Sequence, residues 1–273
     1  MSNLKDFYKV NIYGKSQYIL LNPLNLKFIL NNSPNIFEPG NLKVKFFNMI
    51  MKNNVGISKG CKWKHRRLAN EKTLPQNNDY FNQKVYDKIK EKINYYKDED
   101  FLDFKKLKQI SLKITAFIIF GNENIDSVIV EHLKDVNNFS VLWDMKYKIN
   151  NNLKRKFRYV LKKYIKNPIE NSLVYELVKN KNLNLNELID QIPHFIFPIF
   201  SICPVLISRI LLILTNHKTI LDKAIEEVKS IGDTPKRSIY LRKIILEMVR
   251  LNNPVNTITR NINKDILVGD KRF

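Results

Sequence analysis

Cysteine is scarce in this chain of 273 residues, which contains only Cys61 and Cys203. The two lie far apart and form no Cys-x-x-Cys pair, so we expect neither a disulfide framework nor a zinc site. The first ten residues, MSNLKDFYKV, lack the apolar core of a secretory signal. We therefore expect an intracellular protein, cytoplasmic or peripherally bound to a membrane, in a reducing compartment.

Long apolar runs are also few. The strongest candidate for a membrane span covers residues 195–214, but its uncharged part before Arg209 has only 14 residues. A helix needs about 20 apolar residues to cross a bilayer. Pro198 and Pro204 interrupt the run, and we expect them to break or kink a helix there. The run therefore predicts a buried core helix and no transmembrane anchor.

Acidic residues are heavily outnumbered. Lys and Arg total 47 against 26 Asp and Glu, which gives a formal net charge of +21. This excess favours acidic partners, such as nucleic acid or anionic lipid. The hydrophobic fraction of 44%, with 16 Phe and 12 Tyr, excludes a disordered chain and provides for a packed core.

Hydrophobic periodicity predicts a mainly α fold with a small β portion (α+β). Alternation over about 7–22 indicates a strand pair that turns at Gly14-Lys15. Helical patterns fill about 23–251, ending in two long ones over 192–230 and 238–251. Strand-like alternation returns in the terminal segment, 254–273. Neither repeats nor a linker are visible, so we expect one domain over residues 1–273.

One helical pattern, NNLKRKFRYVLKKYIKN, combines an apolar stripe with a strongly basic face. It holds seven Lys and Arg and no acid, and its basic residues include Lys154, Arg155, Arg158, Lys162 and Lys163. The simplest interpretation is a solvated helix face. Docking on an anionic membrane or on an acidic electron-transfer partner are the alternatives.

Two short motifs have the residue types for binding chemistry. The stretch KGCKWKHRRL gathers basic side chains around an indole as Trp63-x-x-x-Arg67. Taken alone, it indicates a core tryptophan with Arg66 and Arg67 solvated. Further on, Glu247 and Arg250 are three residues apart and can form an ion pair on a helix. Apolar residues flank this pair, so we expect it to be at least partly buried.

The order of these motifs resembles that of the cytochrome P-450 family, the haem-thiolate monooxygenases. The resemblance rests on VGISKG before Trp63, on ITAFIIFG and LLILTNHKTILDKAIEEV, and on LEMVRLNNPV followed by TRNINKD. It implies a partial P450-like fold and a haem cofactor whose propionates are bound by Trp63, Arg67 and Arg260. It also implies that Glu247 and Arg250 form a structural ion pair.

The chain departs from the family at the iron ligand. The family binds iron through the cysteine of Phe-x-x-Gly-x-x-x-Cys-x-Gly, and this chain ends at Phe273 before such a segment. Neither Cys61 nor Cys203 has that sequence context. The resemblance therefore implies a domain truncated before its haem-ligand segment, and no metal ligand can be assigned.

A second departure concerns the acid–threonine pair of the family's central helix. Alignment from Asn216-His217 places this pair at Ser201-Ile202, which leaves the Ser201 hydroxyl as the candidate near the oxygen site and supplies no carboxylate. His194 is interpreted as a structural or capping residue rather than an iron ligand.

We therefore expect a P450-like protein that does not catalyse alone. It would be a remnant, a haem- or ligand-binding pseudoenzyme, or half of a pair completed by another polypeptide, and the sequence indicates no substrate. The alternative is a basic helical module that binds nucleic acid or anionic membrane. A single tryptophan in the basic motif argues against nucleic acid.

Overall fold

The computed structural model describes residues 7–12, 15–74, 79–96, 103–142, 149–232, 238–253, 258–268 and 271–272. Its α-helices are α1 (Pro23–Asn31), α2 (Asn41–Ile50), α3 (Gly60–Thr73), α4 (Asp79–Asn94), α5 (Phe104–Phe120), α6 (Ser127–Leu142), α7 (Asn151–Lys166), α8 (Leu173–Val178), α9 (Leu185–Phe197), α10 (Cys203–Asn216), α11 (Lys218–Ile231) and α12 (Ile239–Leu251). Two shorter turns are a 3-10 turn, η1 (Val55–Ile57), and a π-helical turn, η2 (Pro198–Ile202). The mainly α prediction is confirmed.

The described strands form small antiparallel pairs. They are β1 (Phe7–Ile12) with β2 (Lys15–Leu20), β3 (Phe37–Pro39) with β4 (Arg260–Ile262), and β5 (Leu267–Val268) with β6 (Lys271–Arg272). The predicted strand pair near the N-terminus is confirmed. Its register pairs Ile12 with Lys15, so Lys15 belongs to a strand and not to the turn, and Gly14 lies outside the described residues.

The β3–β4 pair joins the two ends of the chain. Pro39 lies opposite Arg260, so that Arg260 is held beside the start of α2. The Gly40 N–H donates to the Thr259 carbonyl at 3.2 Å. A Cβ at Gly40 would overlap the Thr259 side chain, so only glycine permits this contact.

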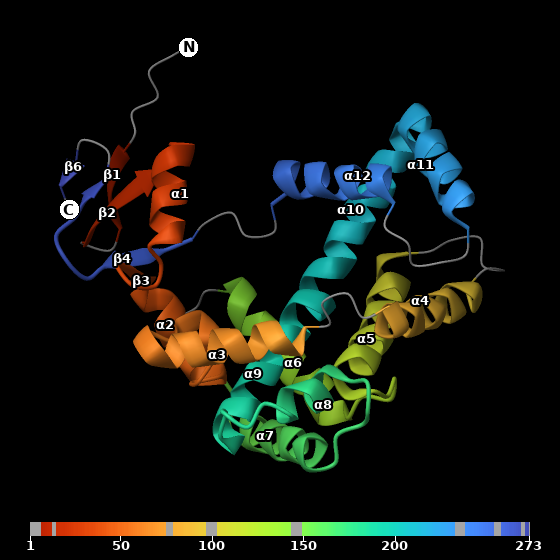
Figure 1. Cartoon of the computed structure of the whole chain (residues 1–273), viewed down its shortest axis with the longest axis horizontal. Coiled ribbons are helices and arrows are strands. Elements are labelled where there is room, and N and C mark those ends of the chain that lie inside the picture. Colours follow the sequence, from red (N-terminus) through yellow and green to blue (C-terminus); the bar gives the residue numbers. More distant parts are fainter. Residues whose placement is uncertain are drawn as a thin grey trace.

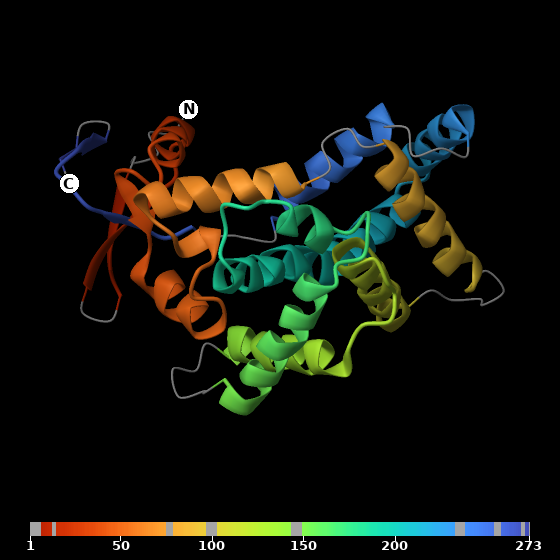
Figure 2. The ribbon, with the colours of Figure 1, turned by 60° about the horizontal axis from the view of Figure 1, so that its bottom comes forward.

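The main core lies among helices α5 to α9, with α7 and α8 below α9 in Figure 1. Its fully buried side chains include Phe120, Leu133, Phe157, Leu161 and Ile196. Helix α5 ends before Gly121, which takes a left-handed conformation with φ of 77° that glycine adopts readily. In Figure 2, α3, drawn in light orange, crosses above this core.

A long helix runs through the molecule as α9, η2 and α10. We expected Pro198 and Pro204 to break or kink the helix; a break is wrong, since the helix continues through the π-helical turn η2, where the Cys203 N–H donates to the Pro198 carbonyl. Proline has no backbone N–H to donate, and the wider spacing of the π-helical turn lets the helix continue without those two donors. At the N-terminus of α9, Asn184 and Glu187 form a reciprocal capping box.

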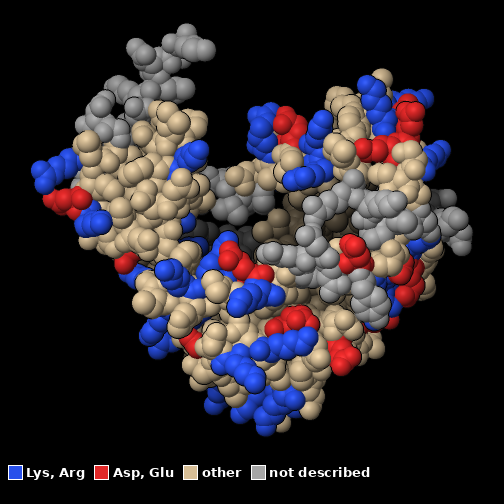
Figure 3. Space-filling model, in the orientation of Figure 1, with Lys and Arg blue, Asp and Glu red and all other residues tan. Residues whose placement is uncertain are grey.

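The segment Leu185–Asn216 is long and apolar enough to cross a membrane, a test that core helices of soluble proteins also pass. Only 22% of its most apolar window is buried. The predicted buried core helix therefore describes α9 and not α10, where Val205, Ile207 and Leu212 are exposed. Figure 3 shows a deep indentation between the part of the molecule that carries α1 and the part that carries α10 to α12.

Candidate anion-binding site

Helix α3 presents its two neighbouring arginines to opposite environments. Arg67 is exposed, and its Nε donates to Glu71 at 2.5 Å. Trp63 lies one turn earlier on the same face and is half-buried. Arg66 is only 6% exposed, so the interpretation of a solvated Arg66 is wrong. A loop and a distant helix supply its partners, which local sequence does not reveal.

Arg66 fastens α3 to α9. Its Nη2 lies 2.7 Å from Glu187 Oε1, and its Nη1 donates to the Ser58 hydroxyl at 2.6 Å. One turn further along α9, Gln191 Oε1 accepts from the Asn70 amide on α3 at 3.2 Å. Because both contacts join the same two helices, they hold the Arg67 end of α3 against α9.

Arg260 approaches the site from β4. It is half-buried; its Nη1 donates to the Thr259 carbonyl at 3.0 Å and its Nε to the Ser33 hydroxyl at 3.2 Å. Burial lowers the pKa of its guanidinium below the usual value. Both acceptors are neutral, so they do not compensate its positive charge.

Lys43 on α2 is a further cation that the sequence did not indicate. Its Nζ lies 5.8 Å from the ring centre of Phe47 and rests against Gly56, where an added Cβ would lie 3.6 Å from it. Burial lowers the pKa of Lys43, and the charge of Arg260 lowers it further. Among the described carboxylates, none forms an ion pair with Lys43.

His194 on α9 completes this group and is half-buried. Burial lowers the pKa of His194, and the charges of Lys43 and Arg67 add to the effect. Side chains from α2, α3, α9 and β4 thus repel one another electrostatically. We call Lys43, Arg67, His194 and Arg260 the cationic cluster. Mutual repulsion around half-buried groups generates a local positive potential that an anion would relieve.

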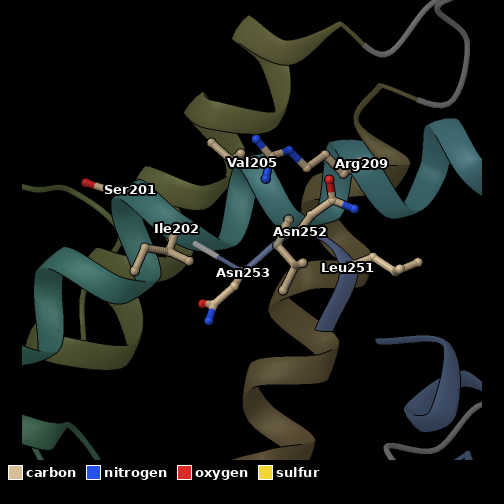
Figure 4. Close-up of a pocket in the computed structure, with 8 residues that line it drawn as sticks. Ser201, Ile202, Val205, Arg209, Leu251, Asn252 and Asn253 are labelled. Atoms are coloured by element: carbon tan, nitrogen blue, oxygen red, sulfur yellow. The ribbon is translucent and has the colours of Figure 1, made fainter. Parts of the chain in front are cut away.

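Ser201 lies inside η2, away from this cluster. Its Oγ is buried and has no hydrogen-bond partner among the described residues. A cavity of about 450 Å³ opens beside it between α10 and the end of α12, lined by Ser201, Ile202, Val205, Leu206, Arg209, Leu251, Asn252 and Asn253. Figure 4 shows the Ser201 hydroxyl directed away from the other labelled side chains. None of these described lining residues is a carboxylate.

The Glu247–Arg250 pair forms, but not where we expected it. Arg250 Nε and Nη2 donate to the two carboxylate oxygens at 2.7 and 2.5 Å. Their side chains are 53% and 67% exposed, so the prediction of partial burial is wrong. Met248 is the one buried residue of α12, and the Glu247 and Arg250 side chains on either side of it in the sequence are exposed. An exposed pair of this kind contributes little to stability, because water and salt screen its charges.

The basic face of α7 is narrower than its sequence indicated. Arg158 pairs with Asp190 and donates to Asn186 Oδ1 at 3.1 Å, while Lys154 donates to the Met49 carbonyl. The proposal of surface contacts through Lys154 and Arg158 is therefore corrected, because both serve internal contacts. The exposed basic residues of α7 are Arg155, Lys156, Lys162, Lys163 and Lys166. Blue side chains gather at that lower edge in Figure 3.

By sequence, no protein-family model and no curated protein matches this chain. Solved structures do match it. A cyanobacterial protein, CYP120A1 bound to retinoic acid, has a TM-score of 0.80 at 18% identity, over 98% of this chain and 67% of that one. A cytochrome P450, CYP102L1, has a TM-score of 0.78 at 14% identity, over 99% of this chain and 72% of that one. The fold is that of a cytochrome P450.

A cytochrome P450 fold implies a haem cofactor. The residues of this chain suit one part of that group, its carboxylates. Among the described residues, Arg67 pairs with Glu71 while Lys43 and Arg260 pair with no carboxylate, and such uncompensated cations suit the two carboxylates of a porphyrin. The cysteines do not suit the iron. Cys61 is exposed on the first turn of α3, and burial raises the pKa of the Cys203 thiol, which disfavours a thiolate. Among the described residues, no group of three or more His, Cys, Asp or Glu could hold a metal ion.

Proposed function

We propose that this P450-like chain binds haem through the two porphyrin carboxylates. The observation that carries the proposal is the cationic cluster, in which the half-buried Lys43 and Arg260 pair with no described carboxylate, while the exposed Arg67 is paired with Glu71. Arg67 and Arg260 would each form a charge-assisted hydrogen bond with a carboxylate. Trp63 would donate its indole N–H from the same face of α3 as Arg67.

The chain's own residues hold and orient the cofactor in this proposal. Haem, when bound, supplies an iron centre for redox chemistry. Bonds to the carboxylates fix one edge of the porphyrin, while the β3–β4 pair fixes Arg260 and the Arg66–Glu187 contact fixes α3. Neither the β3–β4 pair nor the Arg66–Glu187 contact depends on the iron.

We further propose that residues 1–273 form one P450-like domain that does not carry out monooxygenation alone. Neither cysteine is placed as a thiolate, and the described lining of the cavity beside Ser201 includes no carboxylate that could deliver protons. The proposed Ser201 role at an oxygen site has no support from its orientation in Figure 4. Activity would require a polypeptide that completes the haem pocket and an electron-transfer partner.

The haem proposal predicts a carboxylate-dependent affinity. Haemin binding, followed by its absorption band, should weaken about 100- to 10,000-fold in the Arg67→Gln/Arg260→Gln double variant, because each of the two lost charged hydrogen bonds is worth about 1.5–3 kcal/mol. Arg242→Gln, an exposed arginine of α12, is the matched control and should bind as wild type.

The dimethyl ester of haemin separates carboxylate recognition from nonspecific adsorption. It should bind weakly and with the same affinity to wild type and to the double variant, since it has no negative charge for the cluster to recognise. Equal affinities of haemin for wild type and double variant would overturn the proposal.

The remaining basic face of α7 is proposed as the docking surface for an acidic electron-transfer partner. Its five exposed Lys and Arg carry no neighbouring acid on the helix. Affinity for such a partner should fall steeply as ionic strength increases. Lys162→Gln/Lys163→Gln should weaken it and flatten its salt dependence, whereas a salt-independent association would contradict this assignment. Surface plasmon resonance at several salt concentrations provides the measurement.

A further inference from the structure

We infer that the cavity between α10 and the end of α12 binds an amphipathic organic acid, with Arg209 as the partner of its carboxylate. The site shares no residue with the cationic cluster and does not depend on the haem proposal. A ligand of this kind has one anionic group and an apolar body of roughly ten carbons, which a cavity of about 450 Å³ can enclose.

The walls of the cavity are held in place by contacts that lie outside it. Ile210 and Leu214 of α10 pack with Met248 of α12 in a small hydrophobic cluster. At the η2 end, the Ser111 hydroxyl of α5 donates to the Ile199 carbonyl at 3.0 Å. Because none of these residues lines the cavity, a ligand can enter without displacing the contacts that hold the walls.

One face of the long helix supplies much of the lining. Ile202, Val205, Leu206 and Arg209 recur at spacings of three and four residues, which places them on one side of that helix. The stretch from Ile202 to Arg209 is about 10 Å long, because a helix rises about 1.5 Å per residue. Apolar side chains cover most of this length, and the charged group lies at its end. This order matches a ligand whose charge is at one end of an apolar body.

Exposed apolar side chains at the cavity provide surface for the body of the ligand to cover. Val205 is 36% exposed and Leu251 is 57% exposed. They line the cavity from different helices, α10 and α12. Covering both removes apolar surface from water, which is favourable. An organic acid with an apolar body should therefore bind here more tightly than a small hydrophilic anion.

Arg209 carries a charge that no acid in the described part of the chain neutralises. No Asp or Glu occurs between Asp190 and Asp222, so the rest of α10 supplies none. The one acid of α12, Glu247, accepts from Arg250 through both carboxylate oxygens. Among the described side chains, none forms an ion pair or a hydrogen bond with Arg209. Its N–H groups are therefore available to a carboxylate, which a guanidinium can bind through two parallel hydrogen bonds.

Asn252 adds a neutral donor from the other helix. It caps the C-terminus of α12, where its backbone N–H donates to the Met248 carbonyl at 2.8 Å. Its half-buried carboxamide has no partner within the described residues. Figure 4 shows Arg209 and Asn252 toward one end of the lining and Ser201 at the other. A carboxylate can thus accept from a guanidinium and from an amide, while the apolar body extends toward Ile202.

The charge is tested by isothermal titration calorimetry of the protein with decanoate and with decanol. Decanoate should bind at one site, and decanol about tenfold more weakly, because decanol has no charge for Arg209 to bind. Arg209→Gln should weaken decanoate binding about tenfold or more and leave decanol binding unchanged. Arg242→Gln replaces an exposed arginine of α12 that does not line the cavity, and it should bind both ligands as wild type does.

The apolar part is tested by Val205→Trp, whose indole would fill the cavity. Decanoate and decanol should both bind more weakly to this variant. Its circular dichroism should match that of wild type, because Val205 is exposed and supports no other helix. Acetate, which has the charge without the apolar body, should show no saturable binding to wild type in the concentration range where decanoate saturates.

The outcomes separate this inference from the haem proposal. Arg67→Gln/Arg260→Gln, which weakens the cationic cluster, should bind decanoate as wild type does. Absence of saturable decanoate binding, or equal affinities for wild type and Arg209→Gln, would overturn the inference and leave the haem proposal intact. Loss of decanoate binding in Arg67→Gln/Arg260→Gln would place the acid in the cationic cluster and would equally overturn the inference.

Discussion

Replacing Asp190 by alanine is expected to lower the free energy of unfolding by about 3–5 kcal/mol. Asp190 is 2% exposed on α9 and accepts hydrogen bonds from the Asn53 N–H at 3.0 Å and from its amide at 2.9 Å. It also pairs with Arg158 on α7. Its removal leaves a partly buried guanidinium and a backbone N–H without their acceptor, which is the costly way to break such a pair.

Urea unfolding followed by circular dichroism measures this loss. Asp222→Asn, an exposed acid on α11, is the control and should change stability by less than about 0.5 kcal/mol. Because Asp190 also holds the loop that leads into α3, Asp190→Asn should weaken haemin binding as well. A cost below about 1 kcal/mol for Asp190→Ala would mean that this network does not hold the loop.

Stability is expected to fall by up to about 3 kcal/mol as pH decreases from 6.5 to about 4, through His132 alone. His132 on α6 is 0% exposed and stacks on Phe157 at 4.2 Å between ring centres. Burial lowers its pKa from 6.5 to about 4; the Asp135 charge opposes this and Lys154 supports it. Between these values the unfolded chain binds a proton that the folded chain does not, so folding weakens as pH falls. Above pH 6.5 this contribution is complete and constant.

His132→Leu provides the comparison. Neither ring nitrogen has a hydrogen-bond partner among the described residues, so leucine should leave stability at pH 7 unchanged or higher. It should also remove most of the pH dependence, whereas His65→Gln, on the exposed face of α3, should retain it. If His132→Leu loses as much stability as wild type between pH 6.5 and 4.5, His132 is not the group that titrates.

Local patterns in the sequence predicted the elements well, since each depends on residues within a few positions. The strand pair β1–β2 forms as its alternation predicts, and the apolar stripe of α7 is buried through Phe157, Val160 and Leu161. The π-helical turn was not predicted, because proline rules forecast a break but not the hydrogen bond that bypasses it.

Side-chain environments at the site depended on distant partners and were predicted less well. Arg66 and Arg67 have similar local sequence, and only Glu187, 121 residues after Arg66, distinguishes the buried one. The Asn53–Asp190 contact spans 137 residues. Lys43 joins the cluster because β3 and β4 bring Arg260 to α2, and no periodicity indicates that pairing. The exposure of Glu247 and Arg250 likewise depends on which elements cover α12.

The measurement that tests the central claim most directly is a haemin titration of wild type beside Cys61→Ser/Cys203→Ser. If the chain holds haem by its carboxylates, both proteins should bind one haemin with equal affinity and superimposable spectra. Absence of saturable binding to wild type, or a changed spectrum and lost affinity in the cysteine-free variant, would contradict the account.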